Sequence, residues 1–231
     1  MSFIVKQKSV SFSRKISLEW VEYDVALYNK ALFTQYAIKP PLELASWVTQ
    51  RQAQFLAGRV AAKNSLPECY KNQPIGVGNH REPIWPNGRM GSISHADNIS
   101  IAISQAKLSG GLGIDIQSVF DEHEVRSSVT LILSHSDQAL FQGSLSGLSD
   151  RQFLTLVFSA KECFFKAVFN QVGEYFDFNV VSIKSFDSQA RKIVLASDVE
   201  LSENIKPSRN YVIDYVWINN NKIITFLNIT A

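Results

Sequence analysis

The sequence predicts an α+β fold built from two related halves, residues 1–112 and 113–231. Two patterns support this prediction. Apolar residues recur at helical spacing over residues 42–66 and again over 151–169. Alternating apolar residues follow each helix, most clearly over residues 99–103, and such alternation is typical of strands. Each half therefore has a helix followed by antiparallel strands, and we expect the two halves to be pseudo-symmetric.

In the first half, short apolar alternations over the first 40 residues favour strands, and Pro40-Pro41 ends them. A proline pair can also open a helix, and Pro67 closes the predicted one. The stretch 67–91 is rich in Pro, Gly and Asn, which indicates a loop.

The segment 99–104 is predicted to be a strand, with Gly110-Gly111 as a turn after it. The segment 112–117 is then a second strand, which we expect to pair with 99–104 as a hairpin.

In the second half, residues 118–150 are polar and mixed, which predicts short helices and loops. The helix over 151–169 is expected to end at Asn170 and Gly173. A final antiparallel sheet is predicted from strands at 176–180, 193–195, 211–218 and 223–229.

Composition excludes several classes of protein. Hydrophobic residues make up 45% of the chain and charged residues 19%, so we expect a packed core. The sequence contains no run of 18 apolar residues, so we expect no membrane span. Its first residues lack the pattern of a signal peptide. With only two cysteines, Cys69 and Cys163, the sequence does not indicate a disulfide framework, and we expect a cytoplasmic protein.

The net charge of +2 is unevenly distributed along the chain. Residues 1–120 contain 13 Lys and Arg against 8 Asp and Glu, whereas the remainder contains 10 against 13. A basic first half suits a small ligand that carries phosphate, although the asymmetry also fits a surface without function. The chain has no dense basic run, so we expect no nucleic-acid partner.

The helix predicted over 151–169 carries a polar strip on an otherwise apolar surface. Ser159, Glu162 and Lys166 fall together in this strip, while Lys161 lies apart between apolar residues. A buried carboxylate is unfavourable unless it is paired or binds a metal. The simpler interpretation is an ion pair between Glu162 and Lys166 at i, i+4 spacing.

A second group of oxygen ligands is predicted in the strand over 112–117. Asp115 and Gln117 are two residues apart, so both side chains point to one face of this strand. Gly111 and Gly113 allow another backbone or a ligand to approach closely. Asp115, Gln117 and Glu162 together would form an oxygen-only site, which suits Mg²⁺ with water and substrate phosphates. The alternative is that Asp115 and Gln117 lie on an exposed strand edge.

Five short motifs occur in order, and together they resemble the surfactin-type 4′-phosphopantetheinyl transferases, most closely the enterobactin-synthase branch. These motifs are 58–63 (GRVAAK), 85–88 (WPNG), 91–95 (GSISH), 113–116 (GIDI) and 158–167 (FSAKECFFKA). The resemblance covers roughly residues 51–180, and the two ends of the chain carry no motif of this family. It implies a monomer of two pseudo-symmetric α+β halves with coenzyme A bound in the cleft between them.

In the second half, the resemblance implies that Asp115 and Glu162 bind magnesium. Lys161 and Lys166 match the two lysines of the family's K-E-x-x-x-K helix motif and are expected to face coenzyme A phosphates. Where this chain has Gln117, the family usually has glutamate. An amide can donate a neutral oxygen to Mg²⁺ but supplies no charge and cannot act as a base.

In the first half, the resemblance implies further contacts with coenzyme A. His95 follows Ser94 and matches a residue that contacts a coenzyme A phosphate. Arg59 and Lys63 resemble basic positions on the first helix, and Arg81 resembles a basic residue before the W-P segment.

The implied reaction moves the phosphopantetheine arm of coenzyme A onto a serine of an acyl or peptidyl carrier protein. Glu162 is the candidate to accept the serine proton, Lys166 to stabilise phosphate charge, and Asp115 to hold the metal. One alternative is an impaired relative that binds coenzyme A or a carrier without transfer. An Mg²⁺-dependent nucleotide hydrolase is disfavoured by the lack of a G-x-x-x-x-G-K-[ST] motif. A structural protein would leave the buried carboxylates unexplained.

Overall fold

The computed structural model confirms the α+β class, and its contacts divide the chain into two units, Met1–Leu108 and Ser109–Ala231. It describes residues 1–13, 16–107, 109–142, 147–207 and 209–230. The predicted boundary between residues 112 and 113 falls inside strand β7, which belongs to the second unit.

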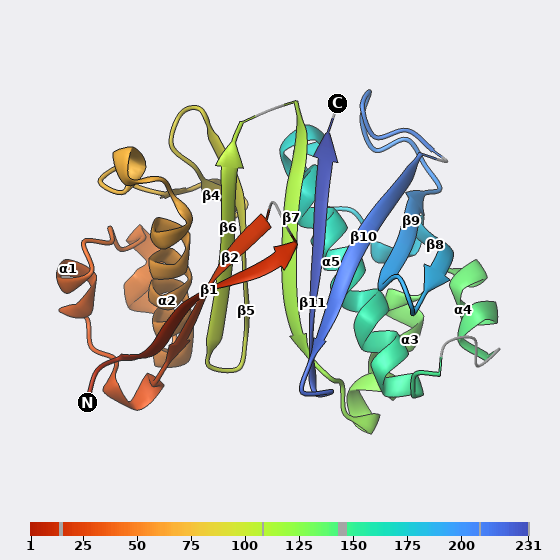
Figure 1. Ribbon diagram of the computed structural model, residues 1–231, viewed down its shortest axis with the longest axis horizontal. Coiled ribbons are helices and arrows are strands. Elements are labelled where there is room, and N and C mark those ends of the chain that lie inside the picture. The colour runs from red at the N-terminus through yellow and green to blue at the C-terminus, as the bar shows by residue number, and fades with distance from the viewer. Residues whose placement is uncertain (14–15, 108, 143–146, 208, 231) are drawn as a thin grey trace. The chain divides into compact units, whose positions relative to one another are not determined.

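The first unit contains a four-stranded antiparallel sheet with the order β1-β2-β6-β5 (Figure 1). Its strands are β1 (Ile4–Ser13), β2 (Ile16–Tyr23), β5 (Arg89–Ala96) and β6 (Ile99–Ala106). The long helix α2 (Thr49–Ser65) packs against β2, β5 and β6. The remaining elements are short: η1 (Val25–Leu27), α1 (Leu32–Gln35), η2 (Leu42–Ser46), η3 (Glu68–Tyr70), β3 (Gly76–Val77) and β4 (Pro83–Ile84).

Helix α2 begins later than the sequence predicts, because the chain between Pro41 and Val48 takes another conformation. Pro41 precedes the short 3₁₀ turn η2, and Trp47 and Val48 then have extended backbone. The ring of Trp47 packs edge-on against Phe55, 5.6 Å between centroids, which places Trp47 beside the helix rather than within it. The buried side of α2 follows the helical period through Ala53, Leu56, Ala57, Val60 and Ala61.

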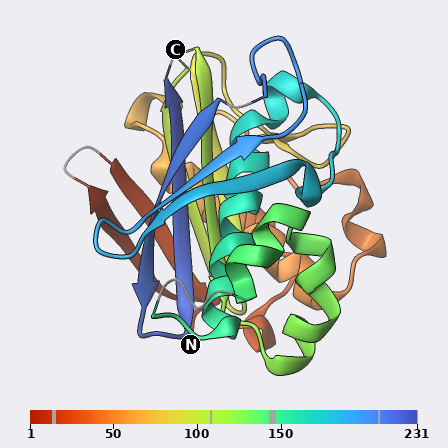
Figure 2. The same cartoon turned by 90° about the vertical axis from the view of Figure 1, so that its right-hand side faces the viewer.

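The second unit contains a five-stranded antiparallel sheet with the order β7-β11-β10-β9-β8. Its strands are β7 (Gly110–Ser118), β8 (Val181–Asp187), β9 (Lys192–Ser197), β10 (Asn210–Ile218) and β11 (Lys222–Thr230). Its helices are α3 (Glu122–Ile132), α4 (His135–Gln142), α5 (Asp150–Val172) and the 3₁₀ turn η4 (Phe178–Val180). Helix α5 lies along β7 and β11, as Figure 2 shows.

Helix α5 is longer than predicted at both ends, and capping interactions satisfy backbone groups at both of its termini. Ser149 and Gln152 form a capping box, in which each side chain bonds the other residue's backbone N–H. The helix ends at Gly173, whose φ of 79° is left-handed and favours glycine, in agreement with the sequence prediction.

Two glycines of β7 allow α5 to contact the strand backbone directly. A Cβ atom on Gly111 would lie 1.9 Å from the carbonyl oxygen of Ala167, and one on Gly113 would lie 2.0 Å from that of Cys163. Neither approach is possible for a residue with a side chain. The helix therefore lies closer to β7 than any larger residue would permit, and its register on the strand is fixed.

The predicted hairpin between 99–104 and 112–117 is wrong. Strand β6 already pairs with β2 on one edge and β5 on the other, so it has no edge left for β7. Strand β7 pairs with β11 instead, with Asp115 opposite Thr225. Gly110 and Gly111 therefore lie within β7 rather than in a turn.

The strand predicted over 176–180 is also wrong, because Phe178–Val180 forms the 3₁₀ turn η4 and β8 begins only at Val181. The alternating phenylalanines there pack on α5 rather than in a sheet, with Phe176 against Phe164 and Phe165, and Phe178 against Phe158. The other predicted strands of this sheet are confirmed.

Each unit is a helix packed on an antiparallel sheet, but the two sheets differ in strand number and order. Pseudo-symmetry between the halves therefore stays a prediction. Within the described residues, no helix is both long and apolar enough to cross a membrane.

We expect Gly113→Ala to destabilise the protein by about 1–3 kcal/mol or more, because the new methyl group meets a backbone carbonyl that cannot rotate away. Urea unfolding would measure the change. Val212→Thr, at an exposed position of the same sheet, should stay within about 0.5 kcal/mol of wild type. A Gly113→Ala variant as stable as wild type would show that α5 does not contact β7 as described.

Candidate functional site

Strand β7 and helix α5 bring three of the predicted site residues of the second unit together. Asp115 comes from the middle of β7, and Glu162 and Lys166 lie one turn apart on α5. The close glycine contact places this side of the helix next to the Asp115 side chain. The predicted polar strip of α5 and the predicted strand carboxylate therefore form one cluster.

Asp115 is the buried anion of this cluster, with only 4% of its surface exposed. One carboxylate oxygen accepts a bond of 2.6 Å from Lys166 Nζ, and the other accepts one of 2.8 Å from Ser159 Oγ. Ser159 lies 3.0 Å from the hydroxyl of Thr225, which in turn donates to the Ser159 carbonyl. These contacts fix the orientation of the Asp115 carboxylate before any ligand binds.

Glu162 is the more accessible carboxylate, with 29% of its side chain exposed. Its Oε2 atom lies 3.7 Å from Lys166 Nζ, so the expected i, i+4 ion pair is present but loose. Burial raises the pKa of Glu162, and the charge of Asp115 raises it further, while Lys166 opposes the shift. Glu162 is therefore a better proton acceptor than an ordinary exposed glutamate.

Lys166 lies between the two carboxylates and serves both. Burial acts to lower its pKa, but the attraction of Asp115 and Glu162 outweighs burial, and the pKa is raised. Lys166 is therefore a firmly charged ammonium. The cluster has two carboxylates and one ammonium, so its net charge is −1.

The donor set of this cluster fits a hard divalent cation. Within the described residues, no three His, Cys, Asp or Glu side chains group to hold a metal, so the site has two carboxylates rather than three. Gln117 follows Asp115 by two residues on β7 and is half-buried, which makes its amide oxygen a third candidate ligand. Mg²⁺ commonly takes one or two carboxylates and completes its shell with water and phosphate oxygens.

Lys161 is not placed to meet a phosphate, which corrects the role expected from the resemblance. Its ammonium is fully buried and donates to the Asp137 carboxylate at 2.7 Å and to the carbonyls of Ile132 and Phe178 at 2.8 and 3.0 Å. An ammonium has three protons, and all three are used. Lys161 thus ties α5 to α3, α4 and η4.

Asp137 completes this buried ion pair. Its carboxylate also accepts bonds from the backbone N–H groups of Ile183 and Ser134, at 2.7 and 3.1 Å. Nothing in the sequence pointed to Asp137, because it lies in the polar stretch 118–150 that has no clear period. Burial lowers the pKa of Lys161, although the charge of Asp137 opposes this shift.

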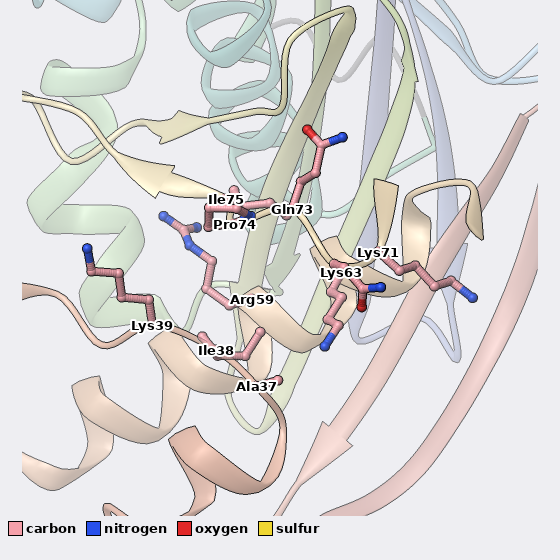
Figure 3. A pocket seen from close by; sticks show the side chains of 10 residues that line it. Ala37, Ile38, Lys39, Arg59, Lys63, Lys71, Gln73, Pro74 and Ile75 are labelled. Atoms are coloured by element: carbon pink, nitrogen blue, oxygen red, sulfur yellow. The ribbon is translucent and has the colours of Figure 1, made fainter. Parts of the chain in front are cut away.

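In the first unit, Arg59 and Lys63 line one pocket of about 160 Å³ (Figure 3). Both come from α2, and Lys39 and Lys71 contribute two further cations from flanking segments. The residues that line the pocket include no carboxylate. Lys71 pairs with the exposed Glu68 at 2.8 Å, whereas the described residues offer Lys39, Arg59 and Lys63 no carboxylate partner. No motif or spacing in the sequence pointed to Lys39 or Lys71.

Arg59 is the buried cation of this pocket. Its Nη2 donates to the Gly76 carbonyl at 2.9 Å, and its guanidinium lies 4.6 Å from the Phe55 ring centroid. Its Nε is buried without a hydrogen-bond acceptor. Burial and the charge of Arg51 lower the pKa of Arg59 to about 10, so the side chain is still charged at neutral pH. A buried cation with an unused donor favours an anionic ligand.

The other predicted residues of this unit lie on β5 and in the loop before β4. Ile93 of β5 packs against the core beneath helix α2, so the half-buried His95 lies on that face of the strand and the buried Ser94 lies on the opposite face. The His95 Nε2 atom lies 3.0 Å from Nη1 of Arg51, a residue that the sequence analysis missed. Arg81 is exposed in its loop with a positive φ of 66°.

Comparison with known proteins identifies both units. The chain matches the family model described as the 4′-phosphopantetheinyl transferase N-terminal domain over residues 41–105. It matches the 4′-phosphopantetheinyl transferase superfamily model over residues 111–216.

The chain is also similar to curated proteins. Enterobactin synthase component D from Escherichia coli is 35% identical over 168 residues, which are 72% of this chain and 78% of that protein. The protein of the same name from Salmonella typhimurium is 36% identical over 123 residues, 53% of this chain and 50% of that protein. The chain thus spans about half the length of this relative. The 4′-phosphopantetheinyl transferase Svp from Streptomyces mobaraensis is 29% identical over 139 residues, 59% of this chain and 55% of that protein.

We expect Lys161→Met to destabilise the protein by about 3–5 kcal/mol, because it leaves the Asp137 carboxylate buried without its counter-charge. Urea unfolding would measure this loss, and adding Asp137→Asn to the variant should recover part of it. Lys184→Met breaks the half-exposed pair with Asp198 and should change stability by less than about 1 kcal/mol. Equal effects of the two lysine variants would argue against a buried Lys161.

Proposed function

Because this chain belongs to the 4′-phosphopantetheinyl transferase superfamily, we propose that it transfers the 4′-phosphopantetheine group of coenzyme A to a serine of a carrier protein. The observation that carries this proposal is the cluster of Asp115, Glu162 and Lys166, in which two carboxylates share one ammonium. A diphosphate ester and a divalent cation fit such a cluster, because cation and anion each find an opposite charge there.

The chemistry is a displacement at phosphorus. The serine oxygen forms a bond to the β-phosphorus of coenzyme A, the bond from that phosphorus to the bridging diphosphate oxygen breaks, and 3′,5′-adenosine bisphosphate leaves. Magnesium, held by Asp115, Glu162 and the amide oxygen of Gln117, would supply charge neutralisation of the diphosphate.

The protein's own residues have separable tasks in this proposal. Glu162 accepts the serine proton, directly or through a water, since burial raises its pKa and it is partly exposed. Lys166 places a positive charge where negative charge develops on the leaving group. Asp115 is held by Ser159 and Lys166, so it fixes the geometry of the cluster.

The pocket of the first unit supports a coenzyme A substrate. Arg59, Lys63, Lys39 and Lys71 surround a space that suits the charge of a phosphate ester, and the lining offers no carboxylate to repel it. We include His95 and Arg81 in the same phosphate-binding role.

The names of the similar proteins, components of an enterobactin synthase, favour a carrier protein of a synthase of that type. We keep a cytoplasmic, monomeric enzyme as the expected state.

The deciding experiment incubates the full chain with coenzyme A, Mg²⁺ and a panel of apo-carrier proteins. We expect intact-protein mass spectrometry to show a carrier gaining one phosphopantetheine group, EDTA to abolish this gain, and added Mg²⁺ to restore it. Glu162→Gln should remain folded and lose transfer by at least about 100-fold. Coenzyme A binding by wild type without modification of any carrier would instead identify a binding protein.

Gln117→Glu is expected to lower the Mg²⁺ concentration needed for half-maximal transfer, because a carboxylate binds Mg²⁺ better than an amide does. Gln117→Ala is the control and should leave that concentration unchanged or raise it. Magnesium titrations of the transfer rate compare the three proteins. Superimposed titrations of wild type and Gln117→Glu would place Gln117 away from the metal.

A further inference from the structure

The buried ion pair between Lys161 and Asp137 connects helix α5 to four other elements of the second unit. Neither side chain is exposed, and the ammonium lies 2.7 Å from the carboxylate. Lys161 also donates to carbonyls of α3 and η4. Asp137, on α4, accepts from backbone N–H groups of β8 and of the segment before α4. The proposed centre of Asp115, Glu162 and Lys166 makes no use of this pair.

The bonds of the pair satisfy backbone groups that the surrounding elements leave open. Ile132 is the last residue of α3, and carbonyls in the last turn of a helix have no partner within the helix. Strand β8 is an edge strand, so the N–H groups on its outer side face no neighbouring strand, and Asp137 accepts the one of Ile183. The pair therefore joins α5 to the edge of the sheet that is farthest from β7 in strand order.

Glu162 lies between two points at which α5 is fixed. The backbone of Cys163 lies directly against Gly113 of β7. Residues two apart on a helix differ in direction by about 200°, so Lys161 and Cys163 lie on nearly opposite sides of α5. Glu162 comes between them, about 100° from each. A rotation of α5 that loosened either contact would therefore move Glu162 relative to Asp115.

Stability alone does not explain a buried ion pair. Two apolar side chains of similar volume are often as stable in such a place, or more so, because no charge has to leave water. The ion pair differs because its bonds have direction. All three protons of the Lys161 ammonium and both carboxylate oxygens of Asp137 meet a particular partner. An apolar pair could fill this space but could not define one rotation of α5.

We propose that Asp137 is a positioning residue for the transfer reaction: through Lys161 it fixes the rotation of α5, and with it the place of Glu162 beside Asp115. This inference rests on the proposed function for the catalytic role of Glu162. Asp137 itself contacts neither substrate nor metal. Its loss should slow the chemical step and leave coenzyme A binding intact, because a displacement of about 1 Å in a catalytic group can cost about 100-fold in rate.

The test compares wild type with Asp137→Asn, the double variant Asp137→Leu with Lys161→Met, and the control Ile193→Ala. Ile193 is fully buried in β9, so its truncation lowers stability through a cavity and removes no bond of the ion pair. Urea unfolding gives the midpoint, calorimetry gives Kd for coenzyme A, and transfer kinetics give kcat under conditions in which each protein is folded. Asp137→Asn should lower kcat about 10- to 100-fold and keep Kd within about 3-fold of wild type. Ile193→Ala should keep kcat within about 3-fold although its midpoint also falls.

The double variant separates positioning from stability, and it decides the question alone if Asp137→Asn does not fold. It leaves no unpaired charge buried, so its unfolding midpoint should lie above that of Asp137→Asn, whereas its kcat should stay low. A double variant that regains both properties would overturn the inference. The same holds for a wild-type kcat in Asp137→Asn, for an equal loss of kcat in Ile193→Ala, and for a loss of coenzyme A affinity as large as the loss of kcat.

Wild type shows which of the two proposals has failed. If one of these contrary results occurs while wild type modifies a carrier, only the role of Asp137 is refuted. If wild type modifies no carrier, the proposed function is refuted and the role of Asp137 with it.

Discussion

The direct contact between helix α5 and strand β7 is the constraint on which the second unit depends. Gly111 and Gly113 bring helical carbonyl groups against the strand, and no other residue type permits that distance. A slip of one residue would present Leu112 to the helix, where its side chain has no room. The same contact sets Asp115 beside Glu162 and Lys166. Packing and chemistry in this unit therefore share one cause.

The structure separates two lysines that the sequence motif presents as equivalents. Lys161 and Lys166 both lie on α5, but they differ by five positions and face different surroundings. Lys166 contacts the two carboxylates of the proposed centre. The Lys161 ammonium instead donates all of its hydrogen bonds to a buried carboxylate and two backbone carbonyls. The helical wheel already set Lys161 apart from the polar strip, and this physical argument proves more reliable for its placement than the motif.

Sequence reasoning succeeded where the signal was local. Helical period and capping residues predicted α5 and its end at Gly173, and alternation predicted most strands of the second sheet. It failed where the answer depends on distant partners. Strand β7 pairs with β11, which lies more than 100 residues later in the chain. The role of Asp137 as the partner of Lys161 depends on the packing of α4 against α5. Arg51 shares a helix face with Arg59 and could have been found by its spacing, although its contact with His95 could not.

Lys166 gives the centre of the second unit an internal counter-ion. Asp115 and Glu162 share an ammonium that is tethered to the same helix, so the chain can hold these carboxylates close together without help from solution. An external cation that joins them competes with a charge whose local concentration is fixed by the covalent chain. Its apparent affinity is then the difference between two interactions, rather than the full attraction of two carboxylates. A centre of this kind favours weak, exchangeable occupancy over permanent sequestration.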